Sequence, residues 1–388
     1  MTQAEAPGEG VPAFAPASLF ATGMPGQDAA RDFLAQAVAQ GRVSHAYLFV
    51  GPPGSGKLDA AYALAQAVVC PDGGCGACDD CERVARRTHP DVHLLSPQSA
   101  QGYLIDQVRE LIDDLSFAPI RAHRKVYIVD EADALGASCA NALLKSLEEP
   151  PADVVFALLA TSRDAVLPTI VSRCQVVPLR SVSSEQAVTS LSAQLAVSEA
   201  ELRRAVGCCS SPSEARGFLA SPERQQARRL ALEAMGTLTT GDELDALRAA
   251  AKATAAAKEP FKALKDEHAR TLKASAELMT AAELRALEVR QQRELAARER
   301  QGTLELFGAQ RSLLRDALMF ASGVDAAPSC DDFAPTARAL ARALGVEGVA
   351  RAIGRVDEAC ARVRGNVSPQ LAMEAMLFDI KEMLPCHS

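Results

Sequence analysis

Short apolar runs alternate with helical patterns between about residues 20 and 180. The clearest runs are 45–50, 126–129 and 154–159, each bounded by polar or turn-forming residues. Runs that are apolar at nearly every position are typical of central strands in a parallel sheet with both faces covered. Because helical segments lie between them, we predict an α/β domain with a parallel sheet over residues 21–180.

The strand pattern ends near residue 181. Residues 181–240 contain short amphipathic stretches separated at Ser211-Pro212 and Ser221-Pro222. We therefore predict a small helical domain over 181–240.

The rest of the chain, 241–388, is also predicted to be helical. Its first part, 243–300, is dense in Ala, Glu, Lys, Arg and Leu, which are strong helix formers. Pro260 is the only strong breaker in that stretch, and Gly302 follows it. Long charged helices, such as a hairpin, are the natural interpretation.

Composition narrows the class of protein. The chain has 388 residues, of which 48% are hydrophobic, with a net charge of −8 and no tryptophan. Because proteins that grip DNA by themselves are usually basic, we do not expect a stand-alone DNA-binding protein. No run of eighteen apolar residues is present, and residues 1–20 lack the basic stretch of a signal peptide. We expect a cytoplasmic protein with no membrane partner and a disordered lead at 1–20.

A glycine-rich loop, residues 51–57, lies directly after the first apolar run and before a helical pattern. Glycines permit tight turns that point backbone N–H groups at phosphate oxygens, and a lysine adds positive charge. A turn without a ligand is the alternative, but the order of strand, loop and helix favours a P-loop. The predicted nucleotide-binding residues of the loop are Gly51, Gly54, Ser55, Gly56 and Lys57.

The loop departs from the full P-loop motif at one position. The motif has serine or threonine after the lysine, where the hydroxyl binds Mg²⁺, and this chain has Leu58. A leucine offers no oxygen to a hard cation. We expect that the loop can still hold ATP or ADP, whereas Leu58 argues against a complete Mg²⁺ site. Hydrolysis should suffer, because Mg²⁺ neutralises charge on the transferred phosphoryl group.

An acidic pair, Asp130 and Glu131, ends the apolar run 126–129. At the end of a buried strand, an aspartate suits metal binding and a glutamate suits polarising a water molecule. An acidic cap between strand and helix is the ordinary alternative. With a P-loop in the same α/β unit, we assign Asp130 to the nucleotide site and Glu131 to catalysis.

Four cysteines fall within twelve residues, and the chain has eleven in all. Clustered thiolates in a reducing compartment bind metal more often than they form disulfides. The spacing predicts one structural Zn²⁺; an iron–sulfur cluster and free thiols are the alternatives. The other seven cysteines are expected to be buried apolar residues or exposed thiols, and His89 and His93 to be structural. The predicted metal ligands are Cys70, Cys75, Cys78 and Cys81.

Several further motifs follow in a fixed order, and together they carry a resemblance to a known family. Besides the P-loop and the four-cysteine insert, they are 26–27, 44–49, His89-Pro90-Asp91, 105–110, 125–133, 141–151 and Ser172-Arg173-Cys174. The series resembles the gamma/tau and delta prime subunits of the bacterial DNA polymerase III clamp loader. The resemblance is detailed over residues 20–180 and general beyond them.

The resemblance implies an AAA+ fold, in which the helical segment 181–240 is a lid and 241–388 a collar. It implies a ring of five subunits with gamma/tau and delta partners, which loads a sliding clamp on primed DNA. In the family, the Ser-Arg-Cys arginine, here Arg173, reaches into the ATP site of a neighbouring subunit. A phosphate-sensing polar residue maps to Thr161 or Ser162.

Leu58 favours a delta prime type with little ATPase activity of its own, as part of the DNA-directed DNA polymerase III holoenzyme. Ser213, where active members carry a lid arginine, supports the same choice, although Arg216 could substitute. The intact remainder of the P-loop keeps open an ATPase-active gamma-type subunit. A zinc-containing AAA+ DNA-repair adaptor is the second alternative, and the acidic charge balance argues against it.

Overall fold

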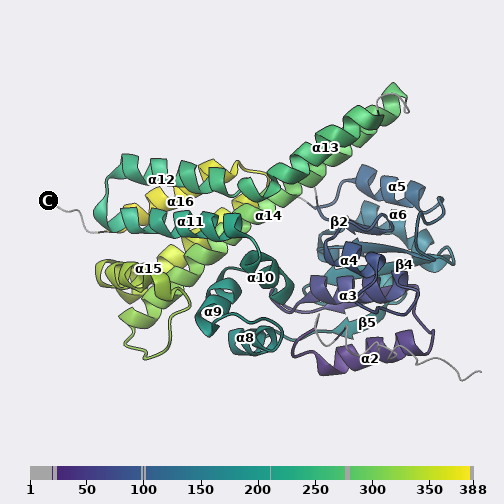
Figure 1. The fold of residues 1–388 in the computed structure, drawn as a ribbon, viewed down its shortest axis with the longest axis horizontal. Coiled ribbons are helices and arrows are strands. Elements are labelled where there is room, and N and C mark those ends of the chain that lie inside the picture. Colours follow the sequence, from purple (N-terminus) through teal and green to yellow (C-terminus); the bar gives the residue numbers. More distant parts are fainter. Residues whose placement is uncertain are drawn as a thin grey trace, which may run out of the picture. The chain divides into compact units, whose positions relative to one another are not determined.

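The computed structural model describes residues 24–97, 102–209, 211–275 and 280–384, together with Phe20 and Ser99. The lead predicted for 1–20 lies outside the described residues apart from Phe20. The chain divides into two compact units, Met1–Val182 and Ser183–Ser388 (Figure 1).

The first unit is built on a five-stranded parallel sheet in the order β2-β3-β4-β1-β5. Its strands are β1 (Ala46–Val50), β2 (Val92–Leu95), β3 (Lys125–Val129), β4 (Val154–Ala160) and β5 (Gln175–Pro178). The three central strands match the three predicted apolar runs. Both edge strands were missed, because they are four residues long and partly exposed, so neither is apolar throughout. The parallel α/β fold is confirmed.

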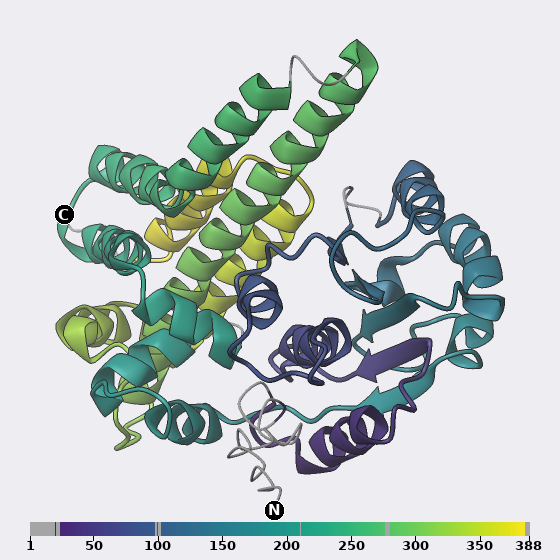
Figure 2. The same ribbon diagram turned by 45° about the vertical axis from the view of Figure 1, so that its right-hand side comes forward.

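Helices cover both faces of this sheet. They are α2 (Asp28–Ala39), α3 (Lys57–Val69), α4 (Asp79–Ala85), α5 (Ile105–Asp114), α6 (Ala137–Glu148) and α7 (Pro168–Val171), with the short η1 (Ala132–Ala134). Alternate residues of β1 face opposite ways, as strand geometry requires. Tyr47 and Phe49 pack with α2, α3 and α4, whereas Ala46 and Leu48 pack with α5, α6 and α7. Figure 2 shows the sheet between these two helical layers.

The second unit is helical throughout its described residues. Its helices are α8 (Ser184–Ser192), α9 (Glu199–Cys208), α10 (Pro212–Leu219), α11 (Pro222–Thr240), α12 (Glu243–Ala256), α13 (Lys262–Ser275), α14 (Ala281–Ala321), α15 (Ala334–Arg364) and α16 (Pro369–Lys381), with η2 (Glu259–Phe261) and η3 (Asp331–Phe333). The predicted breaks at Ser211 and Ser221 are N-caps of α10 and α11, where each serine side chain accepts a hydrogen bond from a backbone N–H. The described helices include none that is both long and apolar enough to span a membrane.

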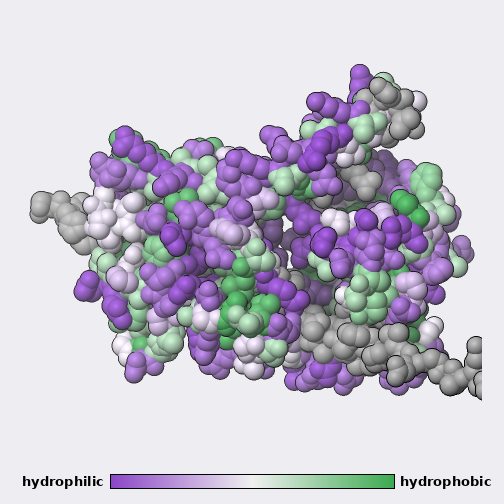
Figure 3. Space-filling model, viewed as in Figure 1, coloured by the Kyte–Doolittle hydropathy of each residue, from purple (hydrophilic) through white to green (hydrophobic). Residues whose placement is uncertain are grey.

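The charged stretch forms the predicted helical hairpin. Pro260 lies in η2, which separates α12 from α13, and α13 then runs beside α14 (Figures 1 and 2). Helix α13 has no buried residue, and its surface is mostly hydrophilic in Figure 3. Helix α14 continues through Gly302 to Ala321. A Cβ on Gly302 would lie 3.0 Å from the carbonyl oxygen of Ala257, so this glycine serves close packing.

One hydrophobic core joins most of the second unit. Buried side chains of α9, α11, α14, α15 and α16 meet in it, among them Leu202, Phe307 and Met373. Helix α15 is interrupted at Gly345, whose φ is +63°. The division into a lid at 181–240 and a collar at 241–388 stays a prediction, because the core of this unit is continuous across it.

Candidate functional site

The glycine-rich loop has the backbone of a phosphate cradle. It leaves β1 and turns through Gly54 and Gly56, whose φ angles are +79° and +78°, before α3 begins at Lys57. These left-handed conformations favour glycine. A Cβ on Gly51 would lie 2.7 Å from both the Leu179 carbonyl oxygen and the Ser55 Oγ atom. The glycines at 51, 54 and 56 therefore permit a tight loop at a helix N-terminus, where anions bind favourably.

The Lys57 ammonium group folds back onto its own loop. Its Nζ atom donates hydrogen bonds to the carbonyl oxygens of Gly51 and Pro52. Burial lowers the pKa of Lys57, while the negative charges of the 130–133 acidic segment raise it. The ammonium group of Lys57 is therefore close enough to these carboxylates to be stabilised by their charge. This is the arrangement expected when a P-loop lysine lies opposite an acidic strand end.

Asp130 stands at the end of β3 in a partly buried position. Burial raises its pKa to about 6, the charge of Glu131 adds to the rise, and Lys57 opposes it. The Oδ1 atom of Asp130 accepts a hydrogen bond from the backbone N–H of Glu131 at 2.9 Å. Glu131 itself has a φ of +47°, which is uncommon for a residue with a side chain and occurs often at functional sites.

Thr161 follows β4, the strand between β1 and β3. Its Oγ1 atom donates a hydrogen bond to the Asp133 carboxylate at 2.6 Å. Because β1, β4 and β3 are parallel neighbours, their carboxyl ends lie at one edge of the sheet, where ligands of open α/β sheets bind. The alternative, Ser162, accepts a hydrogen bond from the backbone N–H of Ala165 instead. Strand order thus brings the predicted nucleotide-site residues to one edge.

Leu58 is partly buried and packs against the hydrophobic cluster that includes Phe49 and Leu64. The side chain at the position of the Mg²⁺-binding hydroxyl is therefore used for packing. With no oxygen at this position, the loop keeps its backbone donors and its lysine but loses one metal ligand.

Arg173 follows α7 directly, at an exposed position. Its Nη2 atom lies 2.5 Å from the Glu148 carboxylate at the end of α6, and its Nη1 atom donates to the Thr169 carbonyl oxygen at 2.9 Å. The side chain is 34% exposed, so the residue is partly buried. The contacts with Glu148 and Thr169 orient an arginine that is partly exposed at the surface.

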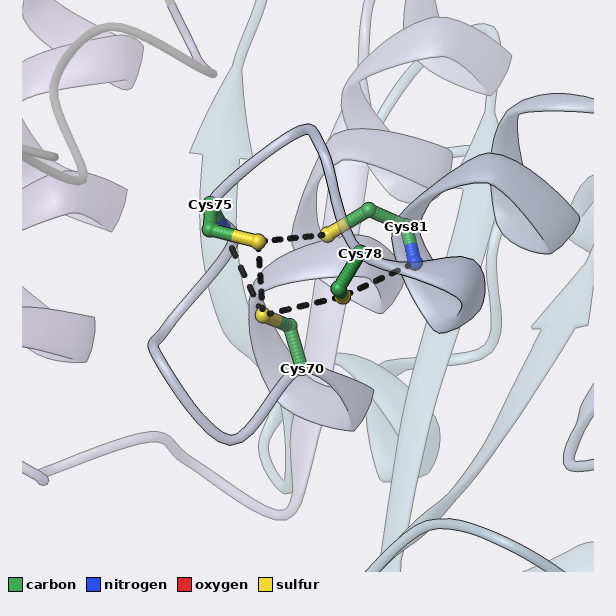
Figure 4. A group of neighbouring side chains, drawn as sticks. All are labelled: Cys70, Cys75, Cys78 and Cys81. Carbon is green, nitrogen blue, oxygen red and sulfur yellow. Dashed lines mark hydrogen bonds between the residues drawn. The ribbon is translucent and has the colours of Figure 1, made fainter.

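Four cysteine sulfurs converge at the C-terminal end of α3 and the start of α4 (Figure 4). The Sγ atom of Cys70 lies 3.7 Å from those of Cys75 and Cys78, and the Sγ atoms of Cys75 and Cys81 are 3.9 Å apart. Sulfurs bound to one tetrahedral zinc at about 2.3 Å would be about 3.8 Å apart. The four cysteines fit a structural zinc site, with all ligand positions supplied by the protein.

Backbone N–H groups around the cluster stabilise negative charge on its sulfurs, whereas burial raises the pKa of Cys78 and of Cys81. N–H groups of Cys75, Gly76 and Cys81 donate to cysteine sulfurs at 3.3 to 3.4 Å. The backbone N–H of Ala77 is the main cause that lowers the pKa of Cys75 to about 7. Gly73 and Gly76 have positive φ angles, which let the loop wrap around one centre. A thiolate is the metal-binding form of cysteine.

The cysteine module is tied to the sheet by residues of the His89-Pro90-Asp91 motif and by Arg121. The Asp91 carboxylate accepts hydrogen bonds from three consecutive backbone N–H groups, those of 120–122. Arg121 in turn donates to Asp79 and Asp80 on α4 at 2.8 and 2.9 Å. His89 is buried beside Asp80 and accepts from the Asp91 backbone N–H, so it is structural, as predicted.

Three residues of the site were not predicted. Tyr103 donates to the carbonyl oxygens of Asp130 and Leu95, Asp133 pairs with Thr161, and Glu148 holds Arg173. Asp133 and Glu148 lie within motifs that carried the family resemblance, so position in a motif was an available signal. Tyr103 lies in none of these motifs. It contacts the end of β3 from a separate turn, so its sequence position did not indicate a place in the site.

Similarity to known proteins is strongest over the first unit. A family model described as DNA polymerase III, delta subunit, matches residues 26–183. The delta prime subunit of Bacillus subtilis is 41% identical over 152 residues, which are 38% of this chain and 45% of that protein. The tau subunit of Salmonella typhimurium is 40% identical over 166 residues, or 42% of this chain and 25% of that protein. This chain spans less than half the length of either relative.

A solved structure of a DNA polymerase III gamma subunit-related protein from Thermotoga maritima aligns with 90% of this chain and 98% of that chain. Its TM-score is 0.43 and its sequence identity 18%.

Proposed function

We propose that this chain works as a delta prime-type subunit of a clamp loader, because its residues 26–183 match the DNA polymerase III delta prime family, which is related to gamma/tau. It would assemble with gamma/tau and delta subunits and help to place a sliding clamp on primed DNA. Its own contribution to ATP hydrolysis would be made in a neighbouring subunit.

The observation that carries this proposal is the contrast between Leu58 and Arg173. The chain's own loop lacks the hydroxyl that binds Mg²⁺, so its own site is poorly equipped for phosphoryl transfer. Arg173, by contrast, is oriented by Glu148 and Thr169 and partly exposed. A guanidinium group is always charged, and its planar fork matches phosphate oxygens. This combination suits a subunit that assists catalysis without performing it.

The test is Arg173→Ala in a reconstituted clamp loader, with Arg86→Ala as the matched control. Arg86 follows α4 and forms an ion pair with Glu82 that is longer and more exposed than that of Arg173 with Glu148. Clamp-stimulated ATP hydrolysis should fall by roughly 10³-fold in the Arg173 variant, the usual effect of losing a trans-acting arginine. Assembly should be unchanged in both variants. Normal hydrolysis and loading by Arg173→Ala would refute the trans-acting role.

An ATPase-active gamma-type subunit is the second candidate, because Lys57, Asp130 and Glu131 are all present and share one charged neighbourhood. The two candidates differ in the isolated chain. A delta prime type should release phosphate far more slowly than about 1 s⁻¹, which is within the ordinary range for enzymes. Steady turnover at or above that rate would favour the gamma type. Leu58→Thr tests whether the missing hydroxyl alone accounts for low activity.

The four-cysteine module is proposed to hold one structural Zn²⁺. Metal analysis of the purified chain should find zinc that is lost in Cys75→Ser. Visible absorption from an iron–sulfur cluster would contradict this assignment.

A further inference from the structure

A second group of thiols lies in the helical unit. Cys208 and Cys209 are adjacent in the chain, and their Sγ atoms are 3.8 Å apart. The Glu305 carboxylate on α14 approaches them, with its Oε1 atom 3.9 Å from the Cys209 sulfur. One ligand atom from each of the three residues lies within 4.8 Å of the other two. The spacing of the two sulfurs is therefore the same as in the four-cysteine module.

The two thiol groups come close to each other because the helix α9 ends between Cys208 and Cys209. Cys208 is the last residue of the helix, and the backbone of Cys209 leaves it with an extended conformation. This change of backbone conformation lets two consecutive side chains converge. The C-terminus of a helix carries partial negative charge from its free carbonyl groups, which favours a cation nearby.

Close packing against α14 brings Glu305 to these thiols. A Cβ on Gly308, one turn beyond Glu305, would lie 2.5 Å from the Cys208 carbonyl oxygen. A Cβ on Gly207 would likewise lie 2.7 Å from the Ser312 Oγ atom. Glycine at both positions is what allows α9 and α14 to meet at this point. The three residues are thus held together by helix packing across 96 positions of sequence.

Arg224 leaves one carboxylate oxygen available. Its Nε and Nη2 atoms both donate to Glu305 Oε2, at 3.0 and 2.7 Å. The Oε1 atom accepts a hydrogen bond from the Cys209 thiol instead, with the two atoms 3.9 Å apart, so a metal ion bound here would replace that thiol proton. Arg224 therefore orients the carboxylate in the way that outer partners orient metal ligands.

The charges balance if a divalent cation is present. Two thiolates and one carboxylate carry three negative charges, and Arg224 with a divalent ion supplies three positive ones. Such a set limits the cost of burying these charges, although the nearby Glu214 carboxylate adds a negative charge that also acts on Arg224 and Glu305. Glu305 and Arg224 are 10% and 22% exposed in their side chains, so the group is shielded but lies near the surface.

We propose that Cys208, Cys209 and Glu305 form a second metal site, separate from the four-cysteine module, for a thiophilic divalent cation such as Zn²⁺ or Cd²⁺. Two sulfur ligands select a borderline or soft ion over Mg²⁺ or Ca²⁺, which prefer oxygen. Three protein ligands leave a fourth position of a tetrahedral ion to water. The ion would fasten the end of α9 to α14.

The experiment counts metal ions on the full chain by native mass spectrometry after equilibration with Zn²⁺. The wild-type chain should carry two ions and Cys208→Ser/Cys209→Ser one. Cys360→Ser, which removes a half-buried thiol outside either group, is the matched control and should keep two. With Cd²⁺ as the probe, thiolate charge-transfer absorption should fall by about one third in the double variant, since two of six thiolates are lost.

Glu305→Gln separates ligand loss from misfolding. It keeps both thiols and should weaken binding of the second ion at least about tenfold while the first ion stays. Circular dichroism verifies that each variant is folded, and Cys209→Ser replaces the double variant if that one unfolds. Equal ion counts for the wild type and the folded cysteine variant would overturn the proposal.

Discussion

The two units bring their reactive side chains together in different ways. In the first unit, the P-loop, Asp130 and Thr161 follow three neighbouring parallel strands, so strand order alone places them at one edge. In the second unit, Cys208, Cys209 and Glu305 meet because two helices approach closely at Gly308. A site built on strand ends tolerates changes in the helices around it, whereas a site built on helix packing depends on a few small residues.

The largest expected effect is loss of the four-cysteine module. Cys81 is fully buried, and Cys81→Ser removes a ligand from a site that ties α4 to α3. Loss of a structural metal is among the few single changes that cost more than about 4 kcal/mol. Chemical denaturation should show this, and hydrogen exchange should place the lost protection in the first unit. Unchanged stability of zinc-free protein would mean that sheet packing alone holds the module.

Gly308→Ala tests the dependence of the second unit on close helix packing. The added Cβ would meet a backbone oxygen that cannot rotate away, so we expect a loss of about 2 kcal/mol in the free energy of unfolding. The control is Gly354→Ala on α15, where a Cβ would meet nothing within 4 Å. That change should instead stabilise the helix by up to about 1 kcal/mol. The same sign for both variants would mean that close helix packing at Gly308 does not determine the stability of the second unit.

Asp130→Asn should change stability in a pH-dependent way. The folded-state pKa of about 6 exceeds the ordinary value of 3.8, so between these values the folded chain holds more protons than the unfolded chain. Keeping Asp130 charged therefore destabilises the fold, fully above pH 6 and hardly below pH 4. The asparagine variant should be more stable by about 1–2 kcal/mol at pH 7.5, after discounting for partial exposure. Urea denaturation at pH 4.5 should show a clearly smaller gain.

Arg121→Gln should have the smallest effect. Arg121 is 40% exposed, and exposed ion pairs contribute between zero and about 1 kcal/mol. The module should therefore keep its metal and most of its stability. A loss as large as that of Cys81→Ser would show that Arg121, rather than the metal, anchors α4.

Sequence patterns predicted local features well and distant contacts poorly. Continuous apolar runs located β1, β3 and β4, since burial on both faces leaves a clear pattern. The strands β2 and β5 are partly exposed, so they show no continuous apolar run in the sequence. The four-cysteine cluster was recognisable because its ligands lie within twelve residues. Glu305 could not be assigned to Cys208, because only the packing of α9 on α14 brings them together.

Gly302 shows that a glycine beside a helical pattern can serve either of two purposes. Near the end of such a pattern, glycine often marks a stop. Within α14 it has another use, since the Ala257 carbonyl oxygen passes too close for a side chain. A single sequence does not separate these two uses.

The three hydrogen bonds that Asp91 accepts have a consequence for the loop that makes them. Ile120, 75% exposed, and Phe117, 66% exposed, lie on or beside this loop, whose backbone is fixed by the buried Asp91 carboxylate. Covering an apolar side chain costs less conformational entropy when its backbone is already ordered. Because Asp91 already orders this backbone, a contact made through Ile120 would lose less conformational entropy on forming. Asp91→Ala would therefore weaken such a contact, although Asp91 itself is buried and takes no part in it.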